Sequence, residues 1–153
     1  MPATDLIHPG ETRNCTVQGV QRIILRQHLD ERGPLCVLGQ GAAALPFVPQ
    51  RLFFTSGVKG TRRGEHAHRQ CAQLLICTSG RLTVLVDDGW CQEEILLCSP
   101  QEALLIPPMI WAEQFDHSPG TVLLVLASHA YDAADYLRTR QDWLEALGSQ
   151  FGI

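Results

Sequence analysis

The segment Gly60–Gly80, GTRRGEHAHRQCAQLLICTSG, decides the fold of this chain. His66 and His68 are two residues apart, and side chains alternate along a β-strand, so both imidazoles of a strand face the same side. The neighbouring runs Leu74–Cys77 and Leu82–Val86 are too apolar for exposed strands. We therefore expect the histidine pair to point into the interior. The open alternative is a surface pair, or two histidines hydrogen-bonded in a core.

Short apolar runs separated by turn signals continue on both sides of this segment. This rhythm is typical of an antiparallel sandwich or barrel, with turns at Asp87–Gly89, Ser99–Pro100 and Ser118–Gly120. The expected strands are Arg22–Leu25, Leu35–Leu38, Arg51–Thr55, Leu74–Thr78, Leu82–Val86, Glu94–Cys98, Ala103–Ile106 and Thr121–Ala127.

The period of the apolar residues changes near the C-terminus. From Ala133 to Leu147 the spacing fits one amphipathic helix, and Gly148 follows as a stop signal. With 153 residues and no evident linker, we expect a single domain over residues 1–153, with a barrel over about 20–130 and a helix over about 133–147.

Composition excludes several classes of function. The 12 basic and 16 acidic residues give a formal charge of −4 without a basic block, so nucleic acid is not an expected partner. No segment has the roughly 20 apolar residues of a membrane span, and the N-terminus does not resemble a signal peptide. The six cysteines form no C-x-x-C pair and are expected to be reduced and structural. We expect a cytoplasmic protein.

The spacing of Gly60, His66, His68, Gln73 and Gly80 resembles the first motif of the cupin superfamily of small β-barrels. Metal-binding cupins add a glutamate where this chain has Gln73 and, in a second motif, a histidine where it has Ala112. Two of four ligands are then missing, so no functional metal is expected and a metal-dependent dioxygenase is disfavoured. Two titratable imidazoles in a partly dry cavity remain, which suits proton transfer near neutral pH.

The two most specific longer strings of the chain are RGEHAH at Arg63–His68 and ASHAYDAADY at Ala127–Tyr136. Together with shorter pieces they resemble the dTDP-sugar 3,4-ketoisomerases, including the domain called WxcM-like, over roughly residues 20 to 145. The other matching pieces are Leu29–Leu35, Pro46–Phe47, Arg51–Phe54, Val86–Gly89 and Pro107–Trp111. The resemblance implies a mainly β cupin (jelly-roll) barrel with one C-terminal helix.

The resemblance also implies a reaction. It implies a cofactor-independent 3,4-ketoisomerase that moves a proton from C3 to C4 of dTDP-4-keto-6-deoxyglucose through an enediol, for deoxyamino-sugar biosynthesis. His66 and His68 are then the catalytic residues, one moving the carbon-bound proton and the other relaying or orienting it. Which histidine does which is left open.

The resemblance further implies a set of substrate-binding residues. Arg63, Arg32 and Arg51 are candidates for the diphosphate, because a guanidinium forks onto phosphate oxygens. Trp111 is a candidate wall of the sugar pocket, and Gln73 a hydrogen-bond partner of the sugar or of a histidine. The alternatives are surface charges for the arginines, core packing for Trp111 and a plain polar strand residue for Gln73.

The chain departs from the family pattern at several positions. Phe53 and Phe54 stand where tyrosines are common, Ala112 replaces a His or Arg, and Glu65 replaces a Phe but should face away from the histidines. These changes leave the C4 configuration of the product open. They also allow a nucleotide-sugar binding or regulatory cupin without isomerase activity, or a dTDP-sugar epimerase.

The resemblance also implies a homodimer formed through exchanged N-terminal strands, which protects sheet edges. Gly19–Leu25 is the candidate exchanged run. The alternative is that this run pairs within its own subunit.

Overall fold

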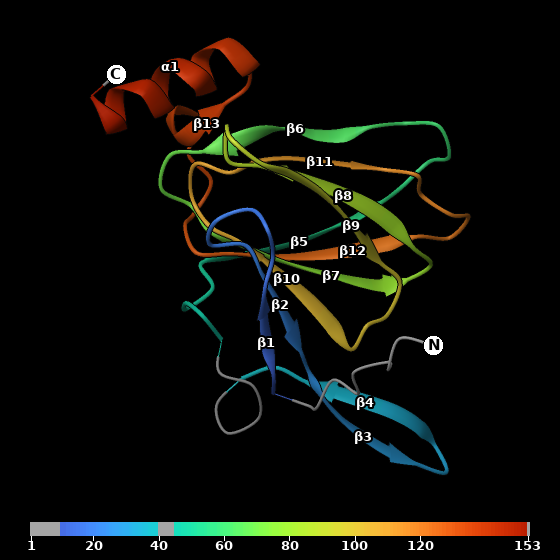
Figure 1. The fold of residues 1–153 in the computed structure, drawn as a ribbon. Coiled ribbons are helices and arrows are strands. Elements are labelled where there is room, and N and C mark those ends of the chain that lie inside the picture. Colours follow the sequence, from blue (N-terminus) through green and yellow to red (C-terminus); the bar gives the residue numbers. More distant parts are fainter. Residues whose placement is uncertain (1–9, 40–44, 153) are drawn as a thin grey trace, which may run out of the picture.

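The barrel consists of two antiparallel sheets packed face to face (Figure 1). The computed structural model describes residues 10–39 and 45–152. The larger sheet has the order β1 (Thr12–Asn14), β2 (Gln21–Ile24), β10 (Glu102–Ile106), β7 (Gln73–Ser79), β12 (Val122–Ala127), β5 (Arg51–Ser56). The smaller sheet has the order β13 (Tyr136–Leu137), β6 (Arg63–His68), β11 (Trp111–Phe115), β8 (Leu82–Asp87), β9 (Gln92–Leu97). The expected mainly β cupin barrel with one C-terminal helix is confirmed.

The core between the sheets comes from alternation along the strands. In β8, Leu82, Val84 and Val86 are fully buried, whereas the residues between them are only partly buried. Leu75 of β7 and Leu104 of β10 meet them from the other sheet. Each such side chain contributes roughly 1.5–3 kcal/mol on burial, so the inner faces fix which side chains point into the barrel.

The C-terminal helix is shorter and later than expected. Instead of a helix over Ala133–Leu147, the chain forms a 3-10 turn (Ala133–Asp135), the strand β13, and then α1 (Arg140–Phe151). Tyr136 and Leu137 form an edge strand that pairs antiparallel with β6, opposite His68 and Ala67. None of the helices within the described ranges is long and apolar enough to cross a membrane.

The ends of α1 have local causes. The Thr139 side chain accepts a hydrogen bond from the Asp142 amide, which caps the start of the helix. Gly148 does not end it, because Gly152 takes the left-handed position at φ 68° and donates to the Gly148 carbonyl. Trp143 is buried against the barrel, and its indole donates to the Met109 carbonyl at 2.8 Å.

The run Gly19–Leu25 pairs within its own subunit. Its strand β2 lies between β1 and β10, antiparallel to both. Both edges of this run are therefore occupied within the subunit, and its exchange with a partner stays a prediction.

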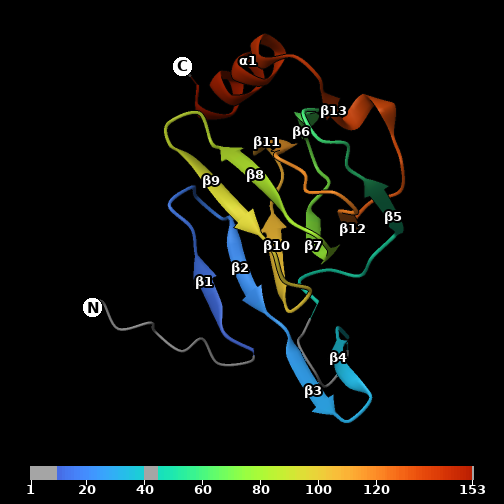
Figure 2. The ribbon, with the colours of Figure 1, turned by 90° about the vertical axis from the view of Figure 1, so that its right-hand side faces the viewer.

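A separate hairpin projects from the barrel. Within the part of the chain that the structure describes, strands β3 (Arg26–Asp30) and β4 (Gly33–Val37) pair only with each other, and they point away from the end that carries α1 (Figures 1 and 2). Leu29 and Leu35 on this hairpin are 74% and 59% exposed. An isolated two-stranded hairpin is at best marginally stable in water, so we expect a further surface to cover this element.

Candidate active site

A small cavity lies between the two sheets. Its volume is about 170 Å³. Strands of both sheets line it through Phe53, Thr55, Arg63, Gly64, His66, Gln73, Gln114, Val125 and Tyr136. The cavity therefore has an apolar wall and several convergent polar groups, as small-molecule sites do.

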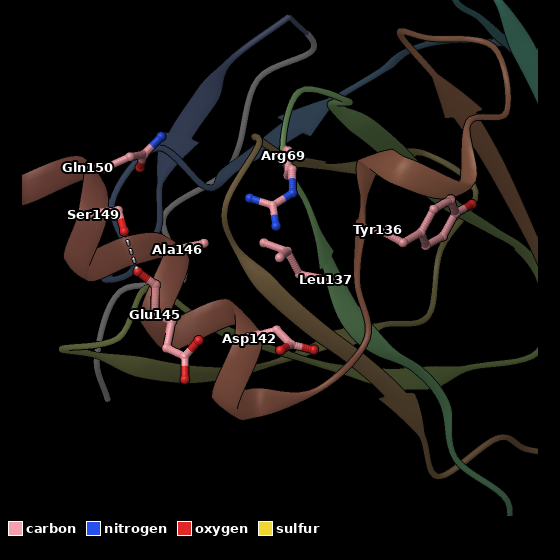
Figure 3. Close-up of a pocket in the computed structure, with 8 residues that line it drawn as sticks. All are labelled: Arg69, Tyr136, Leu137, Asp142, Glu145, Ala146, Ser149 and Gln150. Atoms are coloured by element: carbon pink, nitrogen blue, oxygen red, sulfur yellow. Dashed lines mark hydrogen bonds between the residues drawn. The ribbon is translucent and has the colours of Figure 1, made fainter.

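A larger hollow, of about 500 Å³, lies outside the barrel between α1 and β13 (Figure 3). Arg69 points into it, whereas the phenol of Tyr136 is turned away from α1. Neither His66 nor His68 lines this hollow. We therefore place the chemistry in the smaller cavity, where a histidine reaches the wall.

His66 and His68 lie together, as expected from their spacing. Their ring centroids are 4.9 Å apart and the ring planes are nearly perpendicular, at 87°. His66 is half-buried, and its Nδ1 lies 2.9 Å from the Gly64 carbonyl oxygen. A carbonyl only accepts, so Nδ1 carries the hydrogen and Nε2 is left as an acceptor. His66 thus offers a free basic nitrogen at the cavity wall.

His68 is more deeply buried, and Asp135 holds it in place. The His68 Nδ1 donates to Asp135 Oδ2 at 2.9 Å. The Asp135 carboxylate also accepts from the backbone amides of Gln70 and Cys71, at 2.7 and 3.3 Å. The buried Nε2 of His68 has no hydrogen-bond partner among residues 10–39 and 45–152, and a buried unpaired group typically costs about 1–3 kcal/mol. A role at a functional site would explain why the fold keeps an unpaired basic nitrogen despite this cost in stability.

Burial shifts both imidazoles toward the neutral form. Desolvation lowers the pKa of His66, and the cations of Arg138 and Arg51 act in the same direction. Desolvation and the neighbouring His66 lower the pKa of His68 to about 4, which outweighs the opposing effect of Asp135. Both histidines are therefore neutral near pH 7 and able to accept a proton.

His68, Cys71 and Asp135 form the one group among the described residues with the composition of a metal site, and their ligand atoms lie within 4.8 Å of one another. The Asp135 oxygens already accept hydrogen bonds from His68 and two amides. This full set of contacts fits a carboxylate that fixes the orientation and tautomer of a histidine.

Three of the predicted binding residues lie at or beside the cavity. Arg63 and Gln73 line it, with Arg63 exposed and Gln73 buried. Arg51 lies behind the cavity wall, with its guanidinium 5.3 Å from the ring centroid of Phe53. Its Nη1 donates to the hydroxyl of Tyr136 at 3.3 Å.

Trp111 and Arg32 lie elsewhere in the subunit. Trp111 packs at 5.7 Å from Trp143 beneath α1, so its placement in the sugar pocket was wrong and the packing alternative holds. The physical reason is the alternation of β11, in which Ala112 and Gln114 face the interior and Trp111 faces the helix. Arg32 is at the tip of the β3–β4 hairpin, 85% exposed and paired with Asp30.

Sequence reasoning assigned no role to Tyr136, which the structure places against both histidines. Its ring centroid lies 4.4 Å from that of His68 and 5.1 Å from that of His66. The only signal was its place at the end of the ASHAYDAADY string. Phe53 and Phe54 occupy the two positions where tyrosines are common in the family. Phe53 lines the cavity, whereas Phe54 is 70% exposed.

Two other departures from the family pattern also have defined places. Ala112 stands directly across from His66 in the β11–β6 register. Glu65 is exposed, as its position in the strand predicted.

A barrel of two antiparallel sheets with a histidine pair at its cavity defines a cupin. The chain matches the family "FdtA: WxcM-like, C-terminal" over residues 18–148, and it belongs to that family. It is 38% identical over 117 residues to a TDP-4-oxo-6-deoxy-α-D-glucose 3,4-oxoisomerase of Aneurinibacillus thermoaerophilus, covering 76% of this chain and 84% of that protein.

Solved structures show the same relationship. A mutant of the 3,4-ketoisomerase QdtA from Thermoanaerobacterium thermosaccharolyticum, in complex with TDP-4-keto-6-deoxyglucose, superposes with a TM-score of 0.82 at 31% identity, covering 88% of this chain and 98% of that one. The TDP-quinovose 3,4-ketoisomerase WlaRB from Campylobacter jejuni superposes with a TM-score of 0.79 at 35% identity, covering 84% and 99%.

Proposed function

We propose that this protein is a cofactor-independent 3,4-ketoisomerase of dTDP-4-keto-6-deoxyglucose, acting in deoxyamino-sugar biosynthesis. The observation that carries the proposal is the free, neutral Nε2 of His66 at the wall of a barrel cavity. The family and the 38%-identical oxoisomerase support it.

The reaction needs a group that accepts a proton from one carbon and returns it to the next. The C4 carbonyl acidifies the C3–H bond; removal of that proton gives an enediol, and protonation at C4 gives the 3-keto sugar. A neutral imidazole performs both halves, because it becomes an acid once it has accepted the proton.

We propose different roles for the two histidines. His66 lines the cavity, whereas His68 lies behind it with Asp135 on its far nitrogen. We therefore assign the carbon-bound proton to His66. His68 then orients its neighbour through the perpendicular ring contact.

The residues that line the cavity suggest how the substrate is oriented in it. Arg63 is exposed where it lines the cavity, which supports our proposal that its guanidinium binds the diphosphate as the sugar enters. Gln73 lies on the opposite sheet, buried at the wall, where its amide can hydrogen-bond a sugar hydroxyl.

We also propose that the protein is a homodimer that exchanges the β3–β4 hairpin. This hairpin has no partner sheet among the described residues and exposes Leu29 and Leu35. A second subunit would cover both leucines. The exchange would also give Arg32, which is remote from the cavity of its own subunit, a place at the partner's site.

The alternatives rest on the departures from the family pattern. A binding or regulatory cupin that lacks isomerase activity is favoured by Phe53 at the cavity wall, where a phenol is missing. A dTDP-sugar epimerase would need the same barrel and substrate, but the matching family and the 38%-identical relative favour the ketoisomerase.

Proton NMR in deuterated water tests the proposal. With dTDP-4-keto-6-deoxyglucose, we expect a 3-keto product with deuterium at C4, and the C4 configuration left open by Ala112 can be read from the same spectrum. His66→Asn should lower kcat by about 10²- to 10⁴-fold, as loss of a general base does. His129→Asn, an exposed histidine outside the cavity, is the matched control. Substrate that binds and stays unchanged would favour the binding module.

A further inference from the structure

We infer that Tyr136 is a catalytic acid–base of the isomerisation and replaces the phenol that Phe53 cannot supply. The inference rests on the proposed function and adds to it the group that moves protons between the two sugar oxygens. A ketoisomerase needs such a group, because the proton on the C3 oxygen must leave and the C4 oxygen must gain one.

Tyr136 lies at the reacting face of the cavity. It lines the cavity together with His66 and Phe53. The β13–β6 register sets Tyr136 directly beside His68, with ring centroids 4.4 Å apart. The side chain is half-buried, and Figure 3 shows the phenol directed away from α1.

Arg51 prepares the phenol for proton transfer. Its Nη1 donates to the Tyr136 oxygen at 3.3 Å. A guanidinium has no hydrogen-bond acceptor, so the Tyr136 hydroxyl cannot donate its hydrogen to Arg51. Within the described part of the chain, no group accepts a hydrogen bond from this hydroxyl, so its hydrogen is free for a ligand. The charge of Arg51 stabilises the phenolate that remains after transfer.

Arg51 is itself held in place. Its guanidinium lies 5.3 Å from the ring centroid of Phe53. Such a contact between a cation and an aromatic face fixes the arginine beside the cavity. A cation in this position contributes more to a phenolate than it would on the surface, because the site is partly shielded from water.

The proton transfers balance with one histidine and one phenol. His66 takes the proton from C3, the electrons of the C3–H bond form the C3–C4 double bond, and Tyr136 gives its hydroxyl proton to the C4 oxygen. The phenolate then takes the proton of the C3 hydroxyl, the C3 carbonyl forms, and the His66 imidazolium, after exchanging its proton with solvent, protonates C4. Both residues end in their starting states. The two oxygens are on adjacent carbons, so one phenol serves both.

The test compares the two tyrosines of the chain, Tyr131 and Tyr136. Wild-type turnover of dTDP-4-keto-6-deoxyglucose is measured first; an inactive wild type would overturn the proposed function and this role with it. Given an active wild type, we expect Tyr136→Phe to lower kcat by about 10²- to 10⁴-fold with KM nearly unchanged. The exposed Tyr131→Phe should stay close to wild type.

A rescue variant separates chemistry from packing. In the Tyr136→Phe background, Phe53→Tyr places a phenol back on the wall of the same cavity. We expect it to recover at least about tenfold in kcat, as restoring an acid–base group does. A Tyr136→Phe enzyme whose kcat stays within about threefold of wild type would overturn the inference, because general acid–base groups contribute more than this.

A second measurement keeps the inference testable if Tyr136→Phe does not fold. In the Tyr131→Phe background, growth on 3-fluorotyrosine places a more acidic phenol at residue 136 alone. We expect the alkaline limb of kcat to move to lower pH, because that limb reports the catalytic acid. A packing role would leave the alkaline limb where it is, and that result would contradict a role in proton transfer.

Discussion

His68 shows at the residue scale how burial links the site to stability. Its pKa is about 4 in the folded protein, against 6.5 for an ordinary histidine. Between these two values the unfolded chain binds more protons than the folded one, so the free energy of unfolding falls as the pH drops from about 6.5 toward 4. Above about 6.5 the contribution is complete. His66 and His117, whose pKa values are also lowered, act in the same direction.

Urea unfolding at pH 7.5 and pH 5.0 measures this effect. We expect His68 alone to account for roughly 2 kcal/mol of the loss in stability between the two pH values. His68→Asn should therefore reduce the pH dependence by about that amount, whereas the exposed control His129→Asn should leave it unchanged. The same pH dependence in His68→Asn as in wild type would contradict the argument.

The candidate site was predictable where its geometry is local. His66 and His68 are two residues apart on one strand, so the sequence alone placed their rings together. Asp135 is 67 residues from His68, and only the pairing of β13 with β6 brings it and Tyr136 to the histidines. Trp111 was misplaced for a related reason, since alternation fixes which residues share a face but not which face looks inward.

At the scale of elements, some strands were predictable from the sequence, whereas one strand and the start of the helix were not. The apolar runs of β7, β8 and β12 predicted strands, because those strands are buried on at least one face. β11 was missed, since its sequence WAEQF mixes a residue packed against α1 with polar ones. The helix was placed seven residues too early, because the spacing of apolar residues cannot distinguish a two-residue strand from the first turn of a helix.

The cap at Thr139 gives a prediction at this scale. Thr139→Ala removes the acceptor for the Asp142 amide, which should lower the free energy of unfolding by about 1 kcal/mol. Thr139→Ser keeps the oxygen and should be close to wild type. Because α1 packs outside the barrel, kcat at 25 °C should be unchanged in both variants. Urea unfolding and the isomerase assay test this, and equal stability of the two variants would show that the cap contributes nothing.

For the whole molecule, the exposed hairpin gives a prediction about the proposed dimer. If a second subunit covers Leu29 and Leu35, then Leu29→Arg combined with Leu35→Arg should convert the dimer to a monomer, because charged side chains are not tolerated in a buried apolar contact. Analytical ultracentrifugation gives the mass. Leu144→Arg, at a leucine of α1 that is 52% exposed, is the matched control and should remain dimeric. A wild-type protein that sediments as a monomer would contradict the dimer itself.

Mixing two inactive variants tests whether the hairpin reaches the partner's cavity. Arg32→Ala removes the guanidinium at the hairpin tip, and His66→Asn removes the base in the barrel. In a mixed dimer with exchanged hairpins, one cavity combines an intact His66 with an intact Arg32 from the partner. Random mixing makes half of the dimers mixed, with one intact site in each, so about a quarter of the wild-type activity should return. If Arg32 served only its own subunit, or no site at all, mixing would restore no activity beyond that of the separate variants.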